Sequence, residues 1–98
     1  MPTTALAPAA LELPAPVVTA AHLRYVKARQ AGVVVVDGTG RVATLPGLAP
    51  AQLDDPDLVV LLEHDAVVDY LTEAEGRATE AAAAASADLA GQHARGLL

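Results

Sequence analysis

The densest group of side chains that could perform chemistry is Glu63, His64 and Asp65, with Asp69 four residues after Asp65. Imidazole and carboxylate groups bind metal ions and transfer protons. On a helix, however, consecutive residues point to different sides, so these three side chains cannot converge on one ion. The other two histidines lie far away in the sequence. We therefore expect no metal at this position, and we interpret His64 as an exposed side chain or as a polar residue that sets the register of an interface.

Nucleophilic catalysis lacks its usual groups. The chain has no cysteine, and its one serine, Ser86, is surrounded by alanines without an adjacent base. The carboxylates of Asp54, Asp55 and Asp57 are typical of the start of a helix, where acidic side chains cap free backbone N–H groups. The sequence therefore predicts a protein that is not an enzyme and that holds no cofactor.

A glycine-rich segment, Asp37-Gly38-Thr39-Gly40, has the composition of a loop that binds phosphate. Phosphate-binding loops lead from a strand into a helix, and in the Walker form they contain a lysine. This segment contains no lysine and lies between two runs rich in valine and alternating apolar residues, Val33–Val36 and Arg41–Leu45. That pattern predicts a β-hairpin over residues 33–45.

Charge is distributed unevenly along the chain. The net charge is −6, made up of +2 over residues 1–53 and −8 over residues 54–98. Three cations, Arg24, Lys27 and Arg29, lie close together in the first half. An acidic chain is a poor ligand for nucleic acid, so we expect protein partners. The asymmetry favours contact between the basic half of one copy and the acidic half of another, or neutralisation within one molecule.

Large apolar side chains are scarce in this chain of 98 residues. It contains 23 alanines, 14 leucines and 12 valines, but no Phe, Trp or Ile. Small domains with little apolar area usually depend on disulfides, metals or oligomerisation, and the absence of cysteine leaves oligomerisation. The apolar runs are too short to span a bilayer, and no basic residue precedes Arg24, as a signal peptide would require. We expect a location in a virion or in the cytoplasm.

The expected fold class is α+β. Residues 1–18 contain four of the seven prolines and predict an extended or flexible arm rich in proline and alanine. Residues 19–72 predict a small α+β unit, which begins with a short helix over Ala20–Ala31 that Thr19 caps and Gly32 ends in a left-handed conformation. The hairpin over residues 33–45 follows this helix.

The second half of the chain is acidic and predominantly helical in pattern. Residues 58–62 fit either a strand or a helix, and the preceding Asp55-Pro56-Asp57 favours a helix. A helix is expected from Asp65 to about Ala90, with a bend at Gly76, so residues 73–98 form a long alanine-rich helix with a frayed end. One helical stripe shows steps of three and four, as in a coiled coil. Its members are Val60, His64, Val67, Leu71, Ala74, Ala78, Ala81, Ala85 and Leu89.

The predicted function is that of a structural subunit in a larger symmetric assembly, such as an accessory or decoration protein of a bacteriophage capsid or tail. The alternative is a small acidic regulatory or adaptor protein, antitoxin-like, that binds a basic partner protein. In both cases we expect the partners to be proteins, either copies of the chain or other subunits. The residues predicted for the interface are Val60, His64, Val67, Leu71, Ala74 and Ala78 of the stripe, with the cations Arg24, Lys27 and Arg29.

Overall fold

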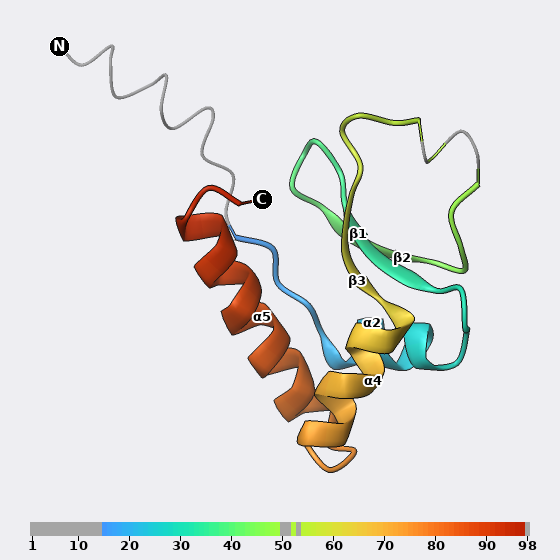
Figure 1. The fold of residues 1–98 in the computed structure, drawn as a ribbon, viewed down its shortest axis with the longest axis vertical. Coiled ribbons are helices and arrows are strands. Elements are labelled where there is room, and N and C mark those ends of the chain that lie inside the picture. Colours follow the sequence, from blue (N-terminus) through green and yellow to red (C-terminus); the bar gives the residue numbers. More distant parts are fainter. Residues whose placement is uncertain (1–14, 50–51, 53, 98) are drawn as a thin grey trace, which may run out of the picture.

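A computed structural model describes residues 15–49, 52 and 54–97 of the chain (Figure 1). This part is α+β, with three helices and a three-stranded antiparallel sheet. The elements are α2 (Ala20–Lys27), β1 (Val33–Val36), β2 (Val42–Leu45), β3 (Val59–Glu63), α4 (His64–Glu73) and α5 (Ala78–Ala94). Most of the predicted arm, residues 1–14, lies outside the described residues. Within the described residues, no helix combines the length and the apolar composition that crossing a membrane requires.

Helix α2 begins where the sequence predicts, because Thr19 caps it. The Thr19 hydroxyl accepts a hydrogen bond from the backbone N–H of His22 at 3.3 Å, and Nδ1 of His22 accepts one from the backbone N–H of Thr19 at 3.0 Å. This reciprocal arrangement is a capping box, in which histidine takes the position that glutamate or glutamine usually occupies. Two of the free N–H groups at the start of the helix are therefore satisfied.

The predicted end of this helix is wrong. The helix stops at Lys27 and not at Ala31, and Gly32 does not adopt a left-handed conformation. Glycine is needed at this position for a different reason. A Cβ atom at Gly32 would lie 3.0 Å from the carbonyl oxygen of Arg29, so a larger residue would force the backbone to shift where the chain turns from α2 into β1.

The hairpin expected over residues 33–45 is present, with β1 paired to β2. Its loop is organised by Asp37, whose Oδ1 accepts hydrogen bonds from the backbone N–H groups of Thr39 and Arg41. Gly40 has a φ of 86°, which a hairpin loop of this length commonly requires. The hydrogen bond from the Thr39 hydroxyl, followed by the backbone hydrogen bonds, lowers the pKa of Asp37 and keeps its carboxylate charged.

Within residues 58–62, for which the sequence favours a helix, Val59 to Leu62 form most of strand β3 instead. Asp55 and Pro56 form a turn, in which the backbone N–H of Leu58 donates to the Asp55 carbonyl oxygen at 3.3 Å. An aspartate followed by proline suits the start of a helix and the first positions of a turn equally well. Pairing of β3 with the distant strand β1 therefore decides the conformation.

The helix predicted from Asp65 to about Ala90 is interrupted, and forms the two helices α4 and α5. Glu75 has a φ of 56° and Gly76 a φ of 83°, so two consecutive residues adopt left-handed conformations. The backbone N–H of Gly76 donates to the carbonyl oxygen of Leu71 at 2.8 Å, as in a Schellman motif. This motif ends α4 fully and lets α5 start in a new direction.

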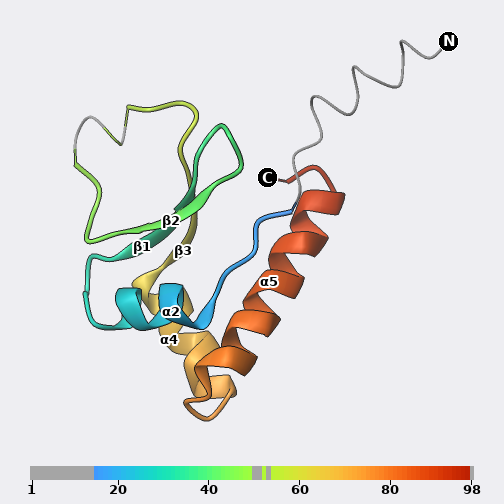
Figure 2. The same ribbon diagram turned by 180° about the vertical axis from the view of Figure 1, so that it is seen from behind.

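The three helices and one face of the sheet enclose the core. Helix α2 contacts both the sheet and α5, and α4 contacts the end of β3 and α5 (Figures 1 and 2). The buried cluster consists of Val18, Leu23, Val26, Val34, Leu62, Val67, Leu71, Ala78, Ala81, Ala82, Ala85 and Leu89. Four of the five buried side chains of α5 are alanines, which lets that helix approach its neighbours closely.

An extended segment, residues 15–19, lies alongside α5 and leads into α2 (Figures 1 and 2). The Ser86 side chain holds it in place. The backbone N–H of Val18 donates to Ser86 Oγ at 2.9 Å, and Ser86 Oγ donates to the Val18 carbonyl oxygen at 3.1 Å. Because Val18 is also buried, the last part of the predicted arm belongs to the core.

Candidate interaction surface

Strand β3 forms one edge of the sheet and exposes two large apolar side chains. The strand order is β2-β1-β3, and no described strand pairs with the outer side of β3. Val59 is 41% exposed and Val60 is 38% exposed, whereas the central strand β1 is almost fully buried. An edge strand also leaves a row of backbone N–H and C=O groups without a strand partner. This edge is therefore the most open apolar feature of the sheet.

The two exposed valines lie on opposite faces of the sheet. Val60 pairs with Val35, and Val59 pairs with Val36. Paired residues of antiparallel strands share a face, and consecutive residues alternate between faces. A bulge between the pairs at Val34 and Val35 adds an extra residue to β3 and interrupts its regular pairing. A strand placed beside β3 would therefore meet a valine on each of its two faces.

Acidic side chains lie at both ends of β3. Asp54, Asp55 and Asp57 precede it, and Glu63 and Asp65 are at its end, all of them exposed. Among the described residues, none of these five forms an ion pair with lysine or arginine. The apolar edge is thus bounded by negative charge at each end, which attracts cationic groups.

A second acidic area lies between α4 and α5. Asp69, Glu73 and Asp88 line a shallow depression of about 290 Å³ together with Tyr70 and Ala66. The Tyr70 hydroxyl donates a hydrogen bond to Asp88 Oδ2 at 2.5 Å. Burial, together with this hydrogen bond and the charge of Asp88, raises the pKa of Tyr70 to about 12. The phenol therefore remains a neutral donor, and it links the two helices.

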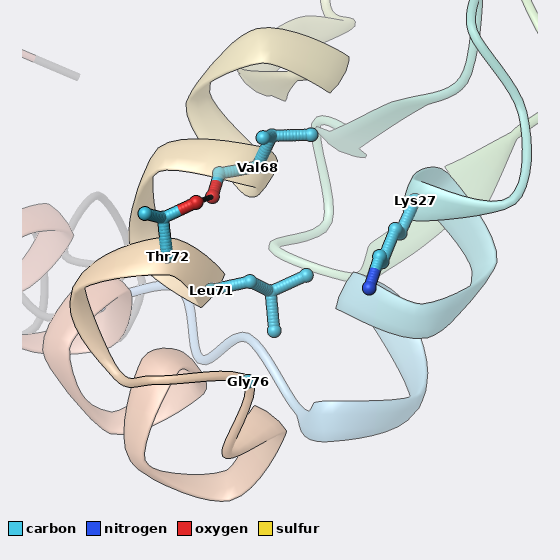
Figure 3. Close-up of a pocket in the computed structure, with 5 residues that line it drawn as sticks. All are labelled: Lys27, Val68, Leu71, Thr72 and Gly76. Carbon is cyan, nitrogen blue, oxygen red and sulfur yellow. Dashed lines mark hydrogen bonds between the residues drawn. The ribbon is translucent and has the colours of Figure 1, made fainter.

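A small cavity of about 190 Å³ lies between α2 and α4 (Figure 3). Lys27 extends toward it from α2, while Val68, Leu71 and Thr72 line it from α4. The Thr72 hydroxyl donates to the Val68 carbonyl oxygen at 2.8 Å, so this group is already satisfied. Sites for small molecules are usually about 300–1,000 Å³. This cavity is smaller, and Lys27 is its one charged side chain.

His64 lies at the start of α4 and is half-buried. Its Nε2 is 3.4 Å from the Lys27 carbonyl oxygen, and its Nδ1 is 3.7 Å from Asp65 Oδ1. Within the part of the chain that the structure describes, no three His, Asp or Glu side chains lie close enough together to hold a metal ion. His64 instead connects the start of α4 to the end of α2.

The helical stripe predicted as an interface lies largely inside the molecule. Val67, Leu71 and Ala78 are buried in the core, and Ala74 packs against it. Their spacing is explained by packing of α4 and α5 on the rest of this chain. Val60 belongs to the edge strand and is the one large apolar member of the predicted set that is exposed.

The predicted cations are all exposed on or just after α2. The Arg29 guanidinium lies 3.8 Å from the centre of the Tyr25 ring, and its Nη1 donates to the Tyr25 carbonyl oxygen at 3.2 Å. Lys27 lies at the small cavity, and Arg24 occurs in the last turn of α2. Cations in this turn interact favourably with the negative end of the helix dipole.

Val59 and Ser86 have roles in the structure but were not among the residues predicted for the interface. Val59 is exposed only because β3 is an edge strand, which no local pattern indicates. Ser86 fixes the segment that contains Val18 beside α5. In the sequence, this role is indicated only by the fact that Ser86 is the single serine in an alanine tract. The chain matches no known family model, and comparisons with curated proteins and with solved structures also gave no match.

Proposed function

We propose that the protein is a non-enzymatic subunit of a larger protein assembly and that the outer edge of β3 is one of its contacts. The observation that carries this proposal is the open edge strand, with Val59 and Val60 both more than a third exposed. The setting that best combines this edge with the proline-rich arm is an accessory or decoration protein of a bacteriophage capsid or tail.

The lack of protection along the β3 edge supports this assignment. Natural proteins usually shorten, charge or cover an edge strand, because an uncovered edge invites pairing with another chain. β3 places its charges at its two ends and leaves valine in its first half. Covering this edge would satisfy backbone groups and remove two valines from water, at about 25 cal/mol per Å² of apolar area.

The attachment of the arm fits the same proposal. Its last residues are fixed to α5 through Val18 and Ser86. A partner that binds residues 1–14 would therefore be joined closely to the folded part of the chain. Deleting residues 1–14 tests this contribution, whereas deleting residues 1–18 would also remove Val18 from the core.

The main experiment compares two valine substitutions in a tagged chain that is expressed in its natural host. Val60→Lys places a charge on the β3 edge, and Val17→Lys makes the same change at a valine that is 63% exposed and outside the sheet. Assemblies are separated by size-exclusion chromatography, and their masses are measured by light scattering. We expect the unmodified chain and Val17→Lys to elute with a high-mass assembly and Val60→Lys to elute as the free chain. Circular dichroism checks that all three chains are folded.

Elution of the unmodified chain only as a free monomer would contradict the proposal. If Val60→Lys still elutes with the assembly, the β3 edge is not one of its contacts, although the assembly itself exists.

The acidic area between α4 and α5 favours a second candidate, an acidic adaptor protein, antitoxin-like, that binds one basic partner. Asp69, Glu73 and Asp88 have no described ion pair with lysine or arginine. This candidate predicts a one-to-one complex whose affinity falls steeply as salt is raised, because surface charges are screened. Light scattering separates it from the first candidate, since a one-to-one complex has a small and fixed mass.

A further inference from the structure

Ser86 and His22 hold opposite sides of a single peptide group. That group joins Val18 to Thr19, so it contains the Val18 carbonyl oxygen and the Thr19 N–H. The carbonyl oxygen accepts a hydrogen bond from Ser86 Oγ at 3.1 Å, and the N–H donates one to Nδ1 of His22 at 3.0 Å. A peptide group is planar and rigid, so its N–H and its carbonyl cannot change direction independently. The attachment of the extended segment to α5 and the cap of α2 therefore depend on the same peptide plane.

The hydrogen bond to His22 exists only while the imidazole is neutral. Nδ1 receives the Thr19 N–H through its lone pair, whereas a protonated imidazole carries an N–H on both nitrogens and has no acceptor left. No rotation of the ring restores the bond. Protonation brings two N–H groups face to face, and the peptide plane relieves this contact by rotating. The same rotation turns the Val18 carbonyl away from Ser86.

The surroundings of His22 do not offset a positive charge. His22 lies in the first turn of α2, where the helix dipole disfavours cations, and Arg24 and Lys27 belong to the same helix. Strands β1 and β2, which pack against α2, contain no titratable residue. Those of α4 and α5 are His64, Asp65, Asp69, Tyr70, Glu73, Glu80, Asp88 and His93. Among the described residues, no carboxylate forms an ion pair with His22.

The pKa of His22 agrees with this geometry. Burial lowers it below the ordinary value of 6.5, so the chain binds a proton at His22 less readily when the segment is attached than when it is released. The segment itself is short. Pro16 and Val18 are buried and Val17 is exposed, so few side chains hold it against α5. Such a segment opens at a lower free energy than the helices and the sheet.

We propose that the peptide group between Val18 and Thr19 is a pH-sensitive attachment point, at which protonation of His22 releases residues 15–18 from α5 while the rest of the described fold stays intact. Val18 leaves the buried cluster that it shares with Ala85 and Leu89, and this side of α5 becomes accessible. The release does not depend on the contact proposed for β3.

The test follows exchange of single amide hydrogens in the full chain by nuclear magnetic resonance. The Val18 amide donates to Ser86 Oγ, so its protection factor, which is corrected for the intrinsic effect of pH, measures attachment. We expect this factor to fall about threefold or more between about pH 7 and about pH 5. The amide of Leu71, a buried residue of α4, should stay at least about tenfold better protected than that of Val18 at both pH values.

Two histidine variants identify the group that titrates. Glutamine is a usual residue at this position of a capping box and accepts a hydrogen bond at any pH. In His22→Gln the protection of Val18 should therefore be independent of pH. His93→Gln removes a histidine near the end of α5 and should keep the dependence of the unmodified chain.

The coupling must also appear in the opposite direction, because linkage is reciprocal. In Ser86→Ala the peptide plane is no longer held by α5, so protonation of His22 disrupts less. The pKa of His22, measured from its ring-proton signals, should rise toward 6.5 in this variant. Ala83→Ser, at an exposed position of the same helix, should leave that pKa unchanged. Circular dichroism verifies that each variant is folded.

Four results would each overturn the proposal. The first is equal protection of Val18 at both pH values, and the second is a pH dependence that persists in His22→Gln. The third is protection of Val18 as strong as that of Leu71, which would mean that the segment opens only when the whole domain unfolds. The last is an unchanged His22 pKa in Ser86→Ala, which would mean that the peptide group does not couple the two side chains.

Discussion

The core formed by the three helices and the edge of β3 differ in how far their apolar side chains are buried, although both belong to a chain with few bulky side chains. On the helical side, Leu23 and Val26 are completely buried, and the alanines of α5 fill the remaining space by close approach. At β3, two valines remain exposed and no described strand covers the edge. A chain poor in large side chains can therefore bury one core fully and still leave apolar side chains exposed along a sheet edge.

The largest effect should come from the closed side. Leu23→Ala removes a fully buried side chain from the centre of the cluster, and truncations of this kind cost about 2–5 kcal/mol. We expect the free energy of unfolding, measured by urea denaturation, to fall by about 3 kcal/mol. Arg24→Ala, at the exposed neighbouring position, should leave it within about 0.5 kcal/mol. A loss as small for Leu23→Ala as for Arg24→Ala would mean that the helical side is not a closed core.

A smaller effect should come from the contact that joins the extended segment to α5. Ser86→Ala removes both hydrogen bonds to the buried Val18 backbone, and we expect the free energy of unfolding to fall by about 1–2 kcal/mol. Exchange of the Val18 amide hydrogen should become faster at the same time. Ala83→Ser, at an exposed position of the same helix, measures the helix-propensity part of the change alone. Unchanged exchange at Val18 would show that the hydroxyl does not hold the segment.

The smallest effect concerns pH and the start of α2. Burial lowers the pKa of His22 below its ordinary value of 6.5, and its neutral Nδ1 accepts the hydrogen bond from Thr19. Below pH 6.5 the unfolded chain binds a proton at this histidine more readily than the folded chain does. Stability should therefore be complete above pH 6.5 and decrease as the pH falls through the lowered pKa. Melting temperatures measured by circular dichroism between about pH 7 and pH 5 record this loss.

His22→Gln keeps an acceptor in the capping box without a titrating group, so its melting temperature should vary less over this range. His93→Gln, at the other end of the helical side, serves as the control and should retain the dependence seen in the unmodified chain. Equal pH profiles for His22→Gln and the unmodified chain would remove His22 as the cause.

Local signals in the sequence predicted the local elements. The glycines and Asp37 specified the hairpin because its loop satisfies its own hydrogen bonds. Thr19 specified the start of α2 for the same reason. The prediction failed for residues 58–62 because Asp55 and Pro56 satisfy a turn as well as a helix start. The choice depends on pairing with β1, which lies more than twenty residues earlier in the chain.

The candidate surface was only partly accessible to sequence reasoning. The helical spacing of Val67, Leu71 and Ala78 is the same for a helix that packs on its own core and for one that packs on a partner. The structure shows that these residues face their own core. Val60 was selected as part of that stripe, but it is exposed for a different reason, since β3 is an edge strand. Edge position is a property of the whole sheet and has no local signature.

The two hydrogen bonds between Ser86 and Val18 also decide how the molecule would respond to tension. A pull on the N-terminus reaches Val18 before it reaches α2 or the sheet, and Ser86 lies near the middle of α5. A pulling force would therefore act first on α5, as a shear force along the helix axis. Strand β3 takes no part in this contact, so the first load does not act on its edge.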